Sequence, residues 1–361
     1  MKIISLVGAR PQFIKLAPLS KLLGQYHDEV VVHTGQHYDD PMSNRIFRDL
    51  NIKTPEYNLE VGSGSHNIQT GKILIQLDGI IQEEKPDLVV VFGDTNSTVA
   101  GALAAKKAHI PVIHIEAGLR SYNRKMPEEI NRIATDHISD HLFAPTQNAM
   151  DILEKEGLKE RSYLTGDIMV DTINQNKQVA AQRSDIIKKL DLNEGEFYLL
   201  TLHRPYNVDD PVNLQNILFQ LGGLDKKVVF PCHPRTEKII RNNHLKIGNN
   251  IFITEPQGYL DFLNLEQNAY KIITDSGGIQ KEAYILKKPC LTLRTETEWL
   301  ETIDEGWNKL IDIHKKNWVA EVAEFNPPEQ QNNVFGESIA ENMVEIINKL
   351  NPNRDTGNPK F

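Results

Sequence analysis

The sequence has few cysteines, no long apolar run and no disulfide pattern, and each absence excludes a class of protein. Only two cysteines occur among 361 residues, Cys232 and Cys290, and each lies next to an apolar run. They indicate small buried side chains rather than a disulfide or a zinc site. No apolar run approaches the roughly 20 residues of a membrane-spanning helix. The first residues also lack the order of a signal peptide, so we expect a soluble, cytoplasmic protein without a membrane partner.

Basic residues are in the minority as well. The chain has 40 Lys and Arg against 49 Asp and Glu, which gives a formal net charge of −9. A nucleic-acid surface needs a basic field, and its stacking platforms need clustered aromatic residues, whereas the aromatic residues are scattered here. We therefore expect no nucleic-acid partner. A small phosphorylated ligand needs only a few local bases, so it is compatible with this charge.

Short apolar segments alternate with amphipathic ones, as in chains built from β-α-β units. Uninterrupted runs such as residues 88–92 are typical of strands buried on both faces of a parallel sheet. The predicted strands are residues 3–7, 30–33, 88–92, 112–115 and 142–144, and, after a break near residues 165–172, residues 197–201, 227–230, 251–254, 271–274 and 290–293. The two series predict an α/β fold with two Rossmann-like, doubly wound domains.

Helices are predicted between these strands. They are residues 11–23, 68–82, 98–107, 212–221, 236–242, 259–266 and 279–286. A polar helix over residues 174–190 separates the two series, and a terminal helix covers residues 337–350. Open parallel sheets bind ligands beyond the carboxyl ends of their strands. We therefore expect the polar residues that follow the strands to line one active-site cleft between the domains.

Two glycine turns lead from a predicted strand into a helix, one in each series. In the first, SLVGARPQFIK, Gly8 permits close approach of a ligand, with Arg10 and Lys15 near the helix start. In the second, TDSGGIQKEA, residues 276–278 offer backbone N–H groups and a hydroxyl to a diphosphate, and Glu282 could accept from ribose hydroxyls. The alternative for either turn is an ordinary strand-to-helix connection with a capped helix.

Acidic residues also follow the strands of the first series. Asp94 and Glu116 end two predicted strands, and Glu128 and Glu129 begin a helix after Pro127. Carboxylates gathered in a dry cleft raise one another's pKa, so one can act as an acid and another as a base. The alternatives are an N-cap for Asp94, and capping or helix-dipole roles for the two glutamates. We predict no metal site, because the acids lack a cation-loop spacing.

Histidine–arginine pairs follow two strands of the second series. His203 precedes Arg204 in TLHRPYN, and His233 and Arg235 flank a proline in PCHPR. The imidazole could move a proton and the guanidinium could bind phosphate. The alternative is a histidine that hydrogen-bonds a carbonyl and orders its loop.

Taken in order, these motifs resemble one family. The segments GARPQFIK, TGQH, GDTNST, IEAGLRS, MPEEINR, LFAPT, TGD, LHRPYNVDD and DSGGIQKEA are similar to those of the non-hydrolysing UDP-N-acetylglucosamine 2-epimerases, and the similarity is collinear up to about Gly306. The resemblance implies the GT-B architecture. Residues 1–168, with a crossing helix at about 345–361, would form the first domain, and residues 169–344 the UDP-binding domain.

The resemblance also implies a reaction and a set of site residues. UDP-GlcNAc would become UDP-ManNAc by elimination of UDP to 2-acetamidoglucal and re-addition, without a cofactor. The product would feed surface polysaccharide synthesis, and the enzyme would be a homodimer. The residues that match the family's catalytic groups are Asp94, Glu116, Glu128 and His203. Those that match its groups for the substrate and a neighbouring activator UDP-sugar are Arg10, Lys15, Gln36, His37, Arg204, His233, Ser276, Gly277, Gly278 and Glu282.

Three departures from the family pattern leave the identity of the sugar substrate undecided. They are Gln12-Phe13 after the first arginine and proline, Pro205-Tyr206 after the His-Arg pair, and Trp299-Leu300 after Thr297-Glu298. The first and third resemble relatives that epimerise UDP-2,3-diacetamido-2,3-dideoxyglucuronate. Remoter alternatives are a hydrolysing epimerase, a GT-B glycosyltransferase and a nucleotide-sugar sensor. A nicotinamide enzyme is disfavoured, since GARPQ replaces the glycine fingerprint after the first strand.

Overall fold

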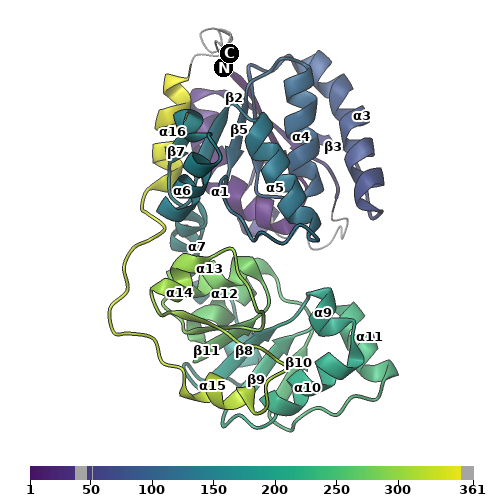
Figure 1. Cartoon of the computed structure of the whole chain (residues 1–361), viewed down its shortest axis with the longest axis vertical. Helices are drawn as coiled ribbons and strands as arrows, with labels where there is room; N and C mark the ends of the chain where they lie inside the picture. Colours follow the sequence, from purple (N-terminus) through teal and green to yellow (C-terminus); the bar gives the residue numbers. More distant parts are fainter. Residues whose placement is uncertain (37–46, 51, 351–361) are drawn as a thin grey trace. The chain divides into compact units, whose positions relative to one another are not determined.

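The chain folds into two α/β units, each with its own parallel sheet between layers of helices (Figure 1). The computed structural model describes residues 1–36, 47–50 and 52–350. Unit 1 contains residues Met1–Thr172 and the chain from Val334 onwards, and unit 2 contains Ile173–Asn333.

The sheet of unit 1 has seven parallel strands in the order β3-β2-β1-β4-β5-β6-β7. The strands are β1 (Lys2–Val7), β2 (Asp28–His33), β3 (Tyr57–Asn58), β4 (Leu88–Phe92), β5 (Val112–Ile115), β6 (His141–Ala144) and β7 (Ser162–Leu164). The order reverses between β1 and β4, which makes this a Rossmann-type sheet with a switch point at that place.

The helices of unit 1 cover both faces of this sheet. They are α1 (Arg10–Tyr26), α3 (His66–Glu84), α4 (Asn96–Lys107), α5 (Pro127–Ile138), α6 (Gln147–Lys155), the 3-10 turn η1 (Lys159–Arg161), the start of α7 (Met169–Arg183) and α16 (Ile339–Lys349). All five residues of β4 are buried, so this central strand packs against helices on both faces.

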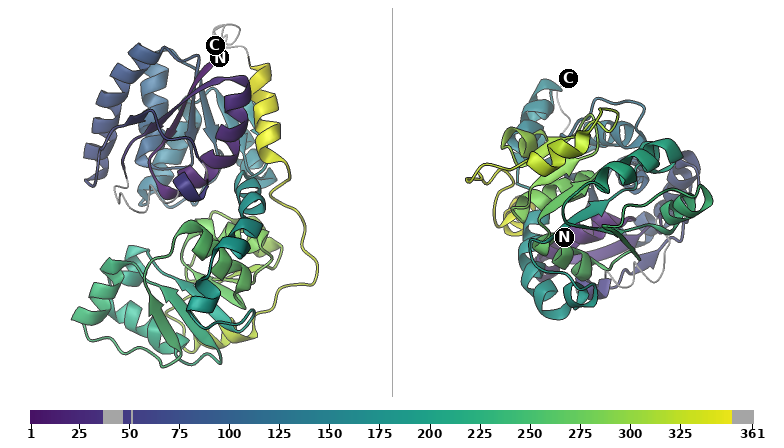
Figure 2. Two further views of the ribbon diagram at one scale, coloured as in Figure 1. Left: turned by 180° about the vertical axis from the view of Figure 1, so that it is seen from behind. Right: turned by 90° about the horizontal axis from the view of Figure 1, so that it is seen from below.

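The last described helix returns to unit 1. The N–H of Asp167 donates to the carbonyl of Phe335 at 2.8 Å, and the N–H of Ala340 donates to Asp171 Oδ2 at 2.6 Å. Gly166, at φ +88°, allows this approach, because a Cβ there would collide with the Phe335 carbonyl. Figure 2 shows α16 beside α1, with which it packs.

The sheet of unit 2 repeats the same winding with six parallel strands in the order β10-β9-β8-β11-β12-β13. The strands are β8 (Phe197–Thr201), β9 (Lys227–Pro231), β10 (Ile251–Thr254), β11 (Lys271–Thr274), β12 (Cys290–Thr292) and β13 (Asn308–Leu310). The helices are the rest of α7, then α8 (Ile186–Lys189), α9 (Pro205–Val208), α10 (Pro211–Leu221), α11 (Pro234–Asn242), α12 (Tyr259–Asn268), α13 (Gly277–Ile285), α14 (Leu300–Asp304) and α15 (Trp318–Glu324).

The predicted strands and the two-sheet α/β fold are confirmed. The prediction of one polar helix over residues 174–190 is wrong, because α7 begins at Met169 and ends at Arg183. Ser184 and Asp185 then interrupt it: the Ser184 hydroxyl donates to Asp261 and accepts from the N–H of Ile186. Such side-chain bonds compete with helical backbone bonds. Short edge strands such as β3, β7 and β13 were missed, since two or three residues carry no periodicity.

The structure also shows the state of the two cysteines and the character of the helices. Both cysteines are free and buried, as the sequence predicts. No helix in the described ranges is long and apolar enough to cross a membrane.

Candidate functional site

Acidic and basic side chains gather at the carboxyl end of the sheet in unit 1. Asp94 follows β4 and Glu116 follows β5, so these neighbouring parallel strands bring them to one edge. Lys15 of α1 pairs with Glu116 at 2.5 Å, and Arg132 of α5 pairs with Asp94 at 2.5 Å. Lys15 and Arg132 are both buried. The structure thus brings together predicted site residues from three elements, and Arg132 is a member that the sequence analysis missed.

The surroundings of Asp94 clearly shift the pKa of its carboxyl group. Burial raises its pKa, Arg132 and Lys15 act in the opposite direction, and Glu116 and Glu128 raise it further. A carboxyl whose pKa is raised can hold or accept a proton closer to neutral pH than an ordinary aspartate. The cluster therefore contains a group suited to proton transfer, beside a lysine–glutamate pair.

The starts of α4 and α5 show whether the acidic residues cap these helices, as the alternative interpretation proposed. Thr95, not Asp94, is the N-cap of α4, and its hydroxyl accepts from the N–H of Thr98. Glu129 does have a structural role: it is fully buried and accepts from the N–H groups of Ser121 and Tyr122. Glu128 is half-buried and lies close enough to influence Asp94. The two adjacent glutamates thus have different environments.

Glu116 has an unusual backbone. Its φ is +73°, in the left-handed region that a residue with a side chain rarely adopts. Its N–H donates to the carbonyl of Phe143, and so does the N–H of Ala117. Such strain persists only where surrounding structure holds it, and it is concentrated at functional sites. The conformation supports a functional role for this carboxylate.

A buried charge network lies directly behind the cluster, and the sequence analysis missed it. Asp136 of α5 accepts from His114 Nδ1 and Arg120 Nη1, each at 2.7 Å, and Arg120 also pairs with Glu156 at 2.6 Å. The other ring nitrogen of His114 lies 2.6 Å from the carbonyl of Gly93. This network holds the turn that carries Asp94. A histidine inside the apolar strand β5 was the only sequence signal for it.

The glycine turn after β1 differs from the expected anion site. The side-chain oxygen Oε1 of Gln12 accepts from the N–H groups of Gly8 and Ala9 at 2.8 and 3.1 Å, so these donors are already used. A Cβ at Gly8 would collide with the hydroxyls of Thr34 and Ser97 rather than with a ligand. Gly8 is therefore required by packing inside unit 1. Arg10 begins α1, immediately after this turn.

We expect Gly8→Ala to destabilise the protein by about 1–3 kcal/mol, because overpacking forces neighbouring groups apart. Thermal unfolding of the full chain measures the effect. The matched control is Gly24→Ala in α1, where a Cβ meets nothing within 4 Å in the described structure. Alanine there is expected to stabilise the helix by up to about 1 kcal/mol. Equal melting temperatures for the two variants would contradict this role of Gly8.

Gln36 of the predicted substrate or activator set follows β2, and its side chain contacts the start of α4. Its side-chain carbonyl accepts from the N–H and the hydroxyl of Ser97 at 3.0 and 2.7 Å. The predicted site residue His37 lies outside the described residues.

In unit 2, Asp275 joins the ends of β8 and β11. This fully buried carboxylate accepts from His203 Nδ1 at 2.9 Å, from the N–H groups of His203 and Arg204, and from Asn207 Nδ2. Burial alone would raise its pKa, but the bonds from His203 and Asn207 lower it. With Nδ1 held, His203 presents Nε2 on a half-exposed ring. The sequence analysis selected His203 and Arg204 but missed the aspartate that orients both.

The second glycine turn begins α13. Ser276 is its N-cap residue, with its N–H donating to Thr274 Oγ1 at 3.0 Å, and Gly277 and Gly278 follow. A Cβ at Gly277 would collide with the Glu298 carboxylate, which therefore packs against this turn. Glu282 is buried one turn farther along. Ser276, the two glycines and Glu282 thus all lie in the first two turns at the start of α13.

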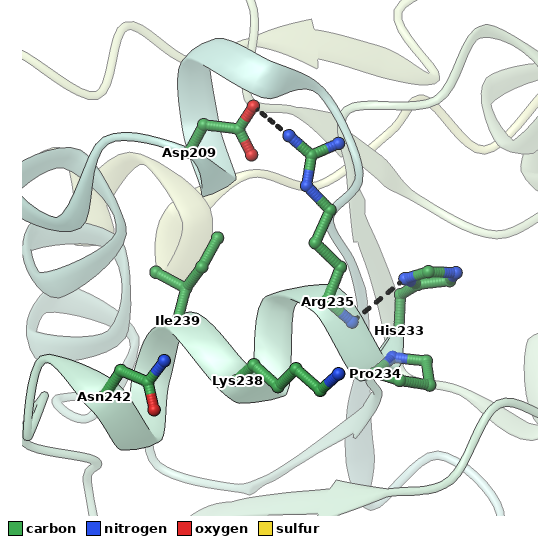
Figure 3. Close-up of a pocket in the computed structure, with 7 residues that line it drawn as sticks. All are labelled: Asp209, His233, Pro234, Arg235, Lys238, Ile239 and Asn242. Carbon is green, nitrogen blue, oxygen red and sulfur yellow. Dashed lines mark hydrogen bonds and ion pairs between the residues drawn. The ribbon is translucent and has the colours of Figure 1, made fainter. Parts of the chain in front are cut away.

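His233 lies at an open pocket of unit 2 (Figure 3). It is the N-cap residue of α11, and its Nδ1 accepts from the N–H of Arg235 at 3.2 Å. Arg235 also pairs with Asp209 across the pocket, and Lys238 adds a second basic group. Figure 3 shows these side chains around the opening. His233 thus caps α11 through a backbone N–H, whereas the predicted alternative was a histidine that hydrogen-bonds a carbonyl.

In the described part of the chain, no group of three or more His, Cys, Asp or Glu side chains is arranged to hold a metal ion.

Comparison with known proteins identifies the family. The family model for UDP-N-acetylglucosamine 2-epimerase matches residues 23–348 of this chain. The chain belongs to the UDP-N-acetylglucosamine 2-epimerase family. As a member of an epimerase family it is an isomerase.

Several relatives match this epimerase over most of its length. A UDP-N-acetylglucosamine 2-epimerase homolog of Methanococcus maripaludis is 48% identical over 357 residues, covering 97% of this chain and 100% of the relative. The UDP-2,3-diacetamido-2,3-dideoxy-D-glucuronate 2-epimerase of Pseudomonas aeruginosa is 46% identical over 319 residues, covering 86% of this chain and 88% of the relative.

A solved structure is similar over the whole fold. The crystal structure of the Methanocaldococcus jannaschii UDP-GlcNAc 2-epimerase in complex with UDP-GlcNAc and UDP has a TM-score of 0.89 and 43% sequence identity, over 96% of this chain and 99% of that one. With two parallel Rossmann-type sheets, this epimerase has the GT-B fold.

Phe13 and Trp299, two of the positions at which this epimerase departs from the common family pattern, are buried, whereas Tyr206 and Leu300 are exposed. Phe13 has no exposed surface, and its ring packs 5.0 Å from His33 and 4.8 Å from Phe47. Trp299 is also buried, with Lys281 Nζ 4.1 Å from its ring centroid. The first change therefore repacks the core of unit 1. The change at Trp299 lies beside the glycine turn of α13, since Trp299 Nε1 would be 3.3 Å from a Cβ at Gly277.

Proposed function

We propose that this epimerase interconverts UDP-GlcNAc and UDP-ManNAc by elimination and re-addition of UDP. The C2–H bond breaks, its electron pair forms the C1–C2 double bond, and UDP leaves with the electron pair of its bond to C1. The 2-acetamidoglucal is then reprotonated at C2 from the other face while UDP re-adds to C1. The reaction is redox-neutral and needs proton donors and acceptors beside a bound diphosphate.

The acidic cluster of unit 1 is the observation that carries this proposal. Asp94, with its raised pKa, and Glu116, held by Lys15 in a strained conformation, are two carboxylates in different environments. Different environments allow one group to donate a proton while another accepts one. Glu128 lies near the same cluster and completes the acid–base set of unit 1. Which carboxylate takes the C2 proton is left open by this proposal.

Unit 2 is proposed to hold the nucleotide. The N–H groups at the start of α13, with Ser276 as N-cap residue, suit a diphosphate, because a helix N-terminus favours anions. As the bond to C1 breaks, UDP gains negative charge, so these donors stabilise the product side more than the ground state. Glu282 is proposed to accept from the ribose hydroxyls. His203 and Arg204 are the other residues of unit 2 proposed to contact the substrate. Asp275 orients both of them.

A second candidate is the same chemistry on UDP-2,3-diacetamido-2,3-dideoxyglucuronate. The Pseudomonas aeruginosa relative carries that name at 46% identity. Trp299, beside the glycine turn of α13, is one of the departures that this chain shares with such epimerases. Arg294, which pairs with Glu298 at 3.0 Å, is a buried cation in the same segment.

Proton NMR in deuterated water tests the chemistry and the sugar together. With the correct UDP-sugar, deuterium is expected at C2 of both epimers, because the abstracted proton exchanges with solvent before reprotonation. UDP-GlcNAc and the diacetamido-glucuronate are supplied in separate samples, and the faster exchange identifies the substrate. Free sugar plus UDP would instead indicate a hydrolysing enzyme. Tight binding without exchange for either sugar would contradict the epimerase proposal.

We also propose that the enzyme supplies a precursor for surface polysaccharide synthesis, is located in the cytoplasm and forms a homodimer. The two free, buried cysteines support a reducing compartment. An activating UDP-sugar is proposed to bind at the basic pocket of unit 2 beside His233, where Arg235 and Lys238 favour an anionic ligand.

A further inference from the structure

The loop between β5 and α5 connects two of the proposed catalytic carboxylates (Figure 1). It leaves the sheet at Glu116 and enters α5 just before Glu128, so both of its ends lie at the carboxyl edge of the sheet in unit 1. Its first half is anchored behind the acidic cluster, because Arg120 is buried and pairs with Asp136 at 2.7 Å. The loop therefore borders the place where the proposed reaction occurs.

Glu129 anchors the middle of this loop. This fully buried carboxylate accepts from the N–H of Ser121 through Oε2 and from the N–H of Tyr122 through Oε1, each at 2.9 Å. The hydroxyl of Ser121 also donates to Oε2, at 3.0 Å. Arg132 Nη1 lies 3.6 Å from the same oxygen, and Arg132 Nη2 pairs with Asp94 at 2.5 Å. The backbone of Tyr122 is thus tied to the acidic cluster through Glu129 and Arg132.

Tyr122 is held in a backbone conformation that does not suit its side chain. Its φ is +59°, in the left-handed region, which glycine or asparagine adopts more readily than a bulky residue. Tyr122 is 72% exposed. Within the described part of the chain, no other aromatic ring stacks on it and no side chain hydrogen-bonds its hydroxyl. Packing within unit 1 therefore does not explain why an aromatic residue occupies this strained position.

The charges around the loop indicate which part of a UDP-sugar an exposed ring would meet there. Asp94, Glu116 and Glu128 lie at this edge of unit 1, and the buried cations Lys15 and Arg132 already pair with two of them. Such an edge attracts a phosphate only weakly. The C–H groups of a pyranose ring, by contrast, pack well against the face of an aromatic ring. The sugar is therefore the part of the ligand that fits a tyrosine beside these acids.

We propose that the ring of Tyr122 packs against the pyranose ring of the bound UDP-sugar and positions it over the acidic cluster. The inference rests on the proposed function, in which Asp94, Glu116 and Glu128 act on this sugar. It adds a residue that contacts the sugar and takes no part in proton transfer. The strained backbone agrees with this role, because strain is retained where the surrounding structure fixes a functional side chain.

Tyr122→Gly removes the ring and the backbone strain at the same time. We expect its melting temperature to equal or exceed that of the wild type, because glycine suits a positive φ. Its KM for the UDP-sugar is expected to rise about tenfold, with a smaller change in kcat, because the contact is present before and during the reaction. Tyr122→Phe keeps the ring and is expected to recover most of the lost affinity. Initial rates of epimerisation measure both variants.

His109→Gly is the matched control for the release of strain. His109 is also an exposed residue of unit 1 with nearly the same φ, +60°. It lies between α4 and β5, at the amino end of the sheet, and thus at the edge opposite the acidic cluster. We expect His109→Gly to change the melting temperature in the same direction as Tyr122→Gly and to leave KM unchanged.

Nitration of tyrosine by tetranitromethane tests the contact without relying on turnover. A saturating UDP-sugar is expected to slow the nitration of Tyr122 about fivefold, because a ligand shields the side chains that it covers. UDP alone lacks the sugar and is expected to give no such protection. Tyr26 is 62% exposed and lies at the end of α1, so it is expected to react at the same rate in every sample. Mass spectrometry of the tryptic peptides measures each site.

Three outcomes would overturn the contact. They are an unchanged KM in Tyr122→Gly, a lower melting temperature of that variant, which would make Tyr122 structural, and equal protection of Tyr122 by UDP and by the UDP-sugar. The deuterium-exchange assay is run on the same wild-type samples. A wild type that exchanges deuterium but gives any of these results refutes the role of Tyr122 and leaves the proposed reaction intact. A wild type that exchanges with neither sugar refutes the proposed function itself.

Discussion

Asp94→Asn is expected to lower kcat by about a hundredfold or more, as loss of an acid–base group does. The asparagine oxygen can still accept from Arg132, which bonds Asp94 at 2.5 Å in the wild type, so the contact between α5 and the turn after β4 is retained. What disappears is the titratable proton of a carboxyl whose pKa burial raises. Glu116→Gln is expected to have an effect of similar size, because it removes the charge that pairs with Lys15. Initial rates of epimerisation measure both.

Asp140→Asn is the matched control for Asp94→Asn. Asp140 also belongs to unit 1, pairs with a cation, Lys106, and has the same 31% exposed side chain as Asp94. It lies outside the acidic cluster, so we expect kcat within twofold of the wild type. The melting temperatures of Asp94→Asn and Glu116→Gln are expected to stay close to the wild type. Unfolding of both variants, or retention of a tenth of the activity, would show that these acids are structural.

Removing Asp136 is expected to have the largest effect on stability. Asp136→Ala leaves Arg120 and His114 buried without their shared carboxylate, and breaking a buried ion pair costs about 3–5 kcal/mol. For a unit of this size that corresponds to a fall in melting temperature of about 6–20 °C. Calorimetry of the full chain measures it. Glu345→Ala, which breaks the exposed pair with Lys349, is the control and is expected to cause no measurable change.

The same residue predicts a pH dependence. Burial alone would raise the pKa of Asp136, but hydrogen bonds from His114 and Arg120 outweigh it, so the folded-state pKa is lowered. Asp136 therefore contributes stability above its unfolded pKa of about 3.9, and this contribution is lost as the pH falls through the folded value. Between pH 7 and pH 3, the wild type should lose more stability than Asp136→Ala. Parallel losses would contradict the role of the ionised carboxylate.

The fold was predictable because its strands are short, apolar and uninterrupted. Residues 88–92 are apolar at every position, and β4 is buried at every position. The interruption of the polar helix at Ser184 was not predictable from periodicity, because the partner of its hydroxyl, Asp261, is far along the chain. Two-residue and three-residue edge strands were missed for a similar reason, since pairing with a neighbour defines them.

The sequence by itself determined the two Rossmann-type units and the positions of Asp94, Glu116, His203 and the α13 turn. These residues follow strands, and in parallel sheets the carboxyl ends of strands meet at one edge. Only the tertiary structure decided which partner each polar group has. Gln12 takes the donors of the first glycine turn, Glu129 anchors a loop, and Asp275 orients His203. Such pairings depend on distances between segments far apart in the chain, which local propensity and periodicity do not encode.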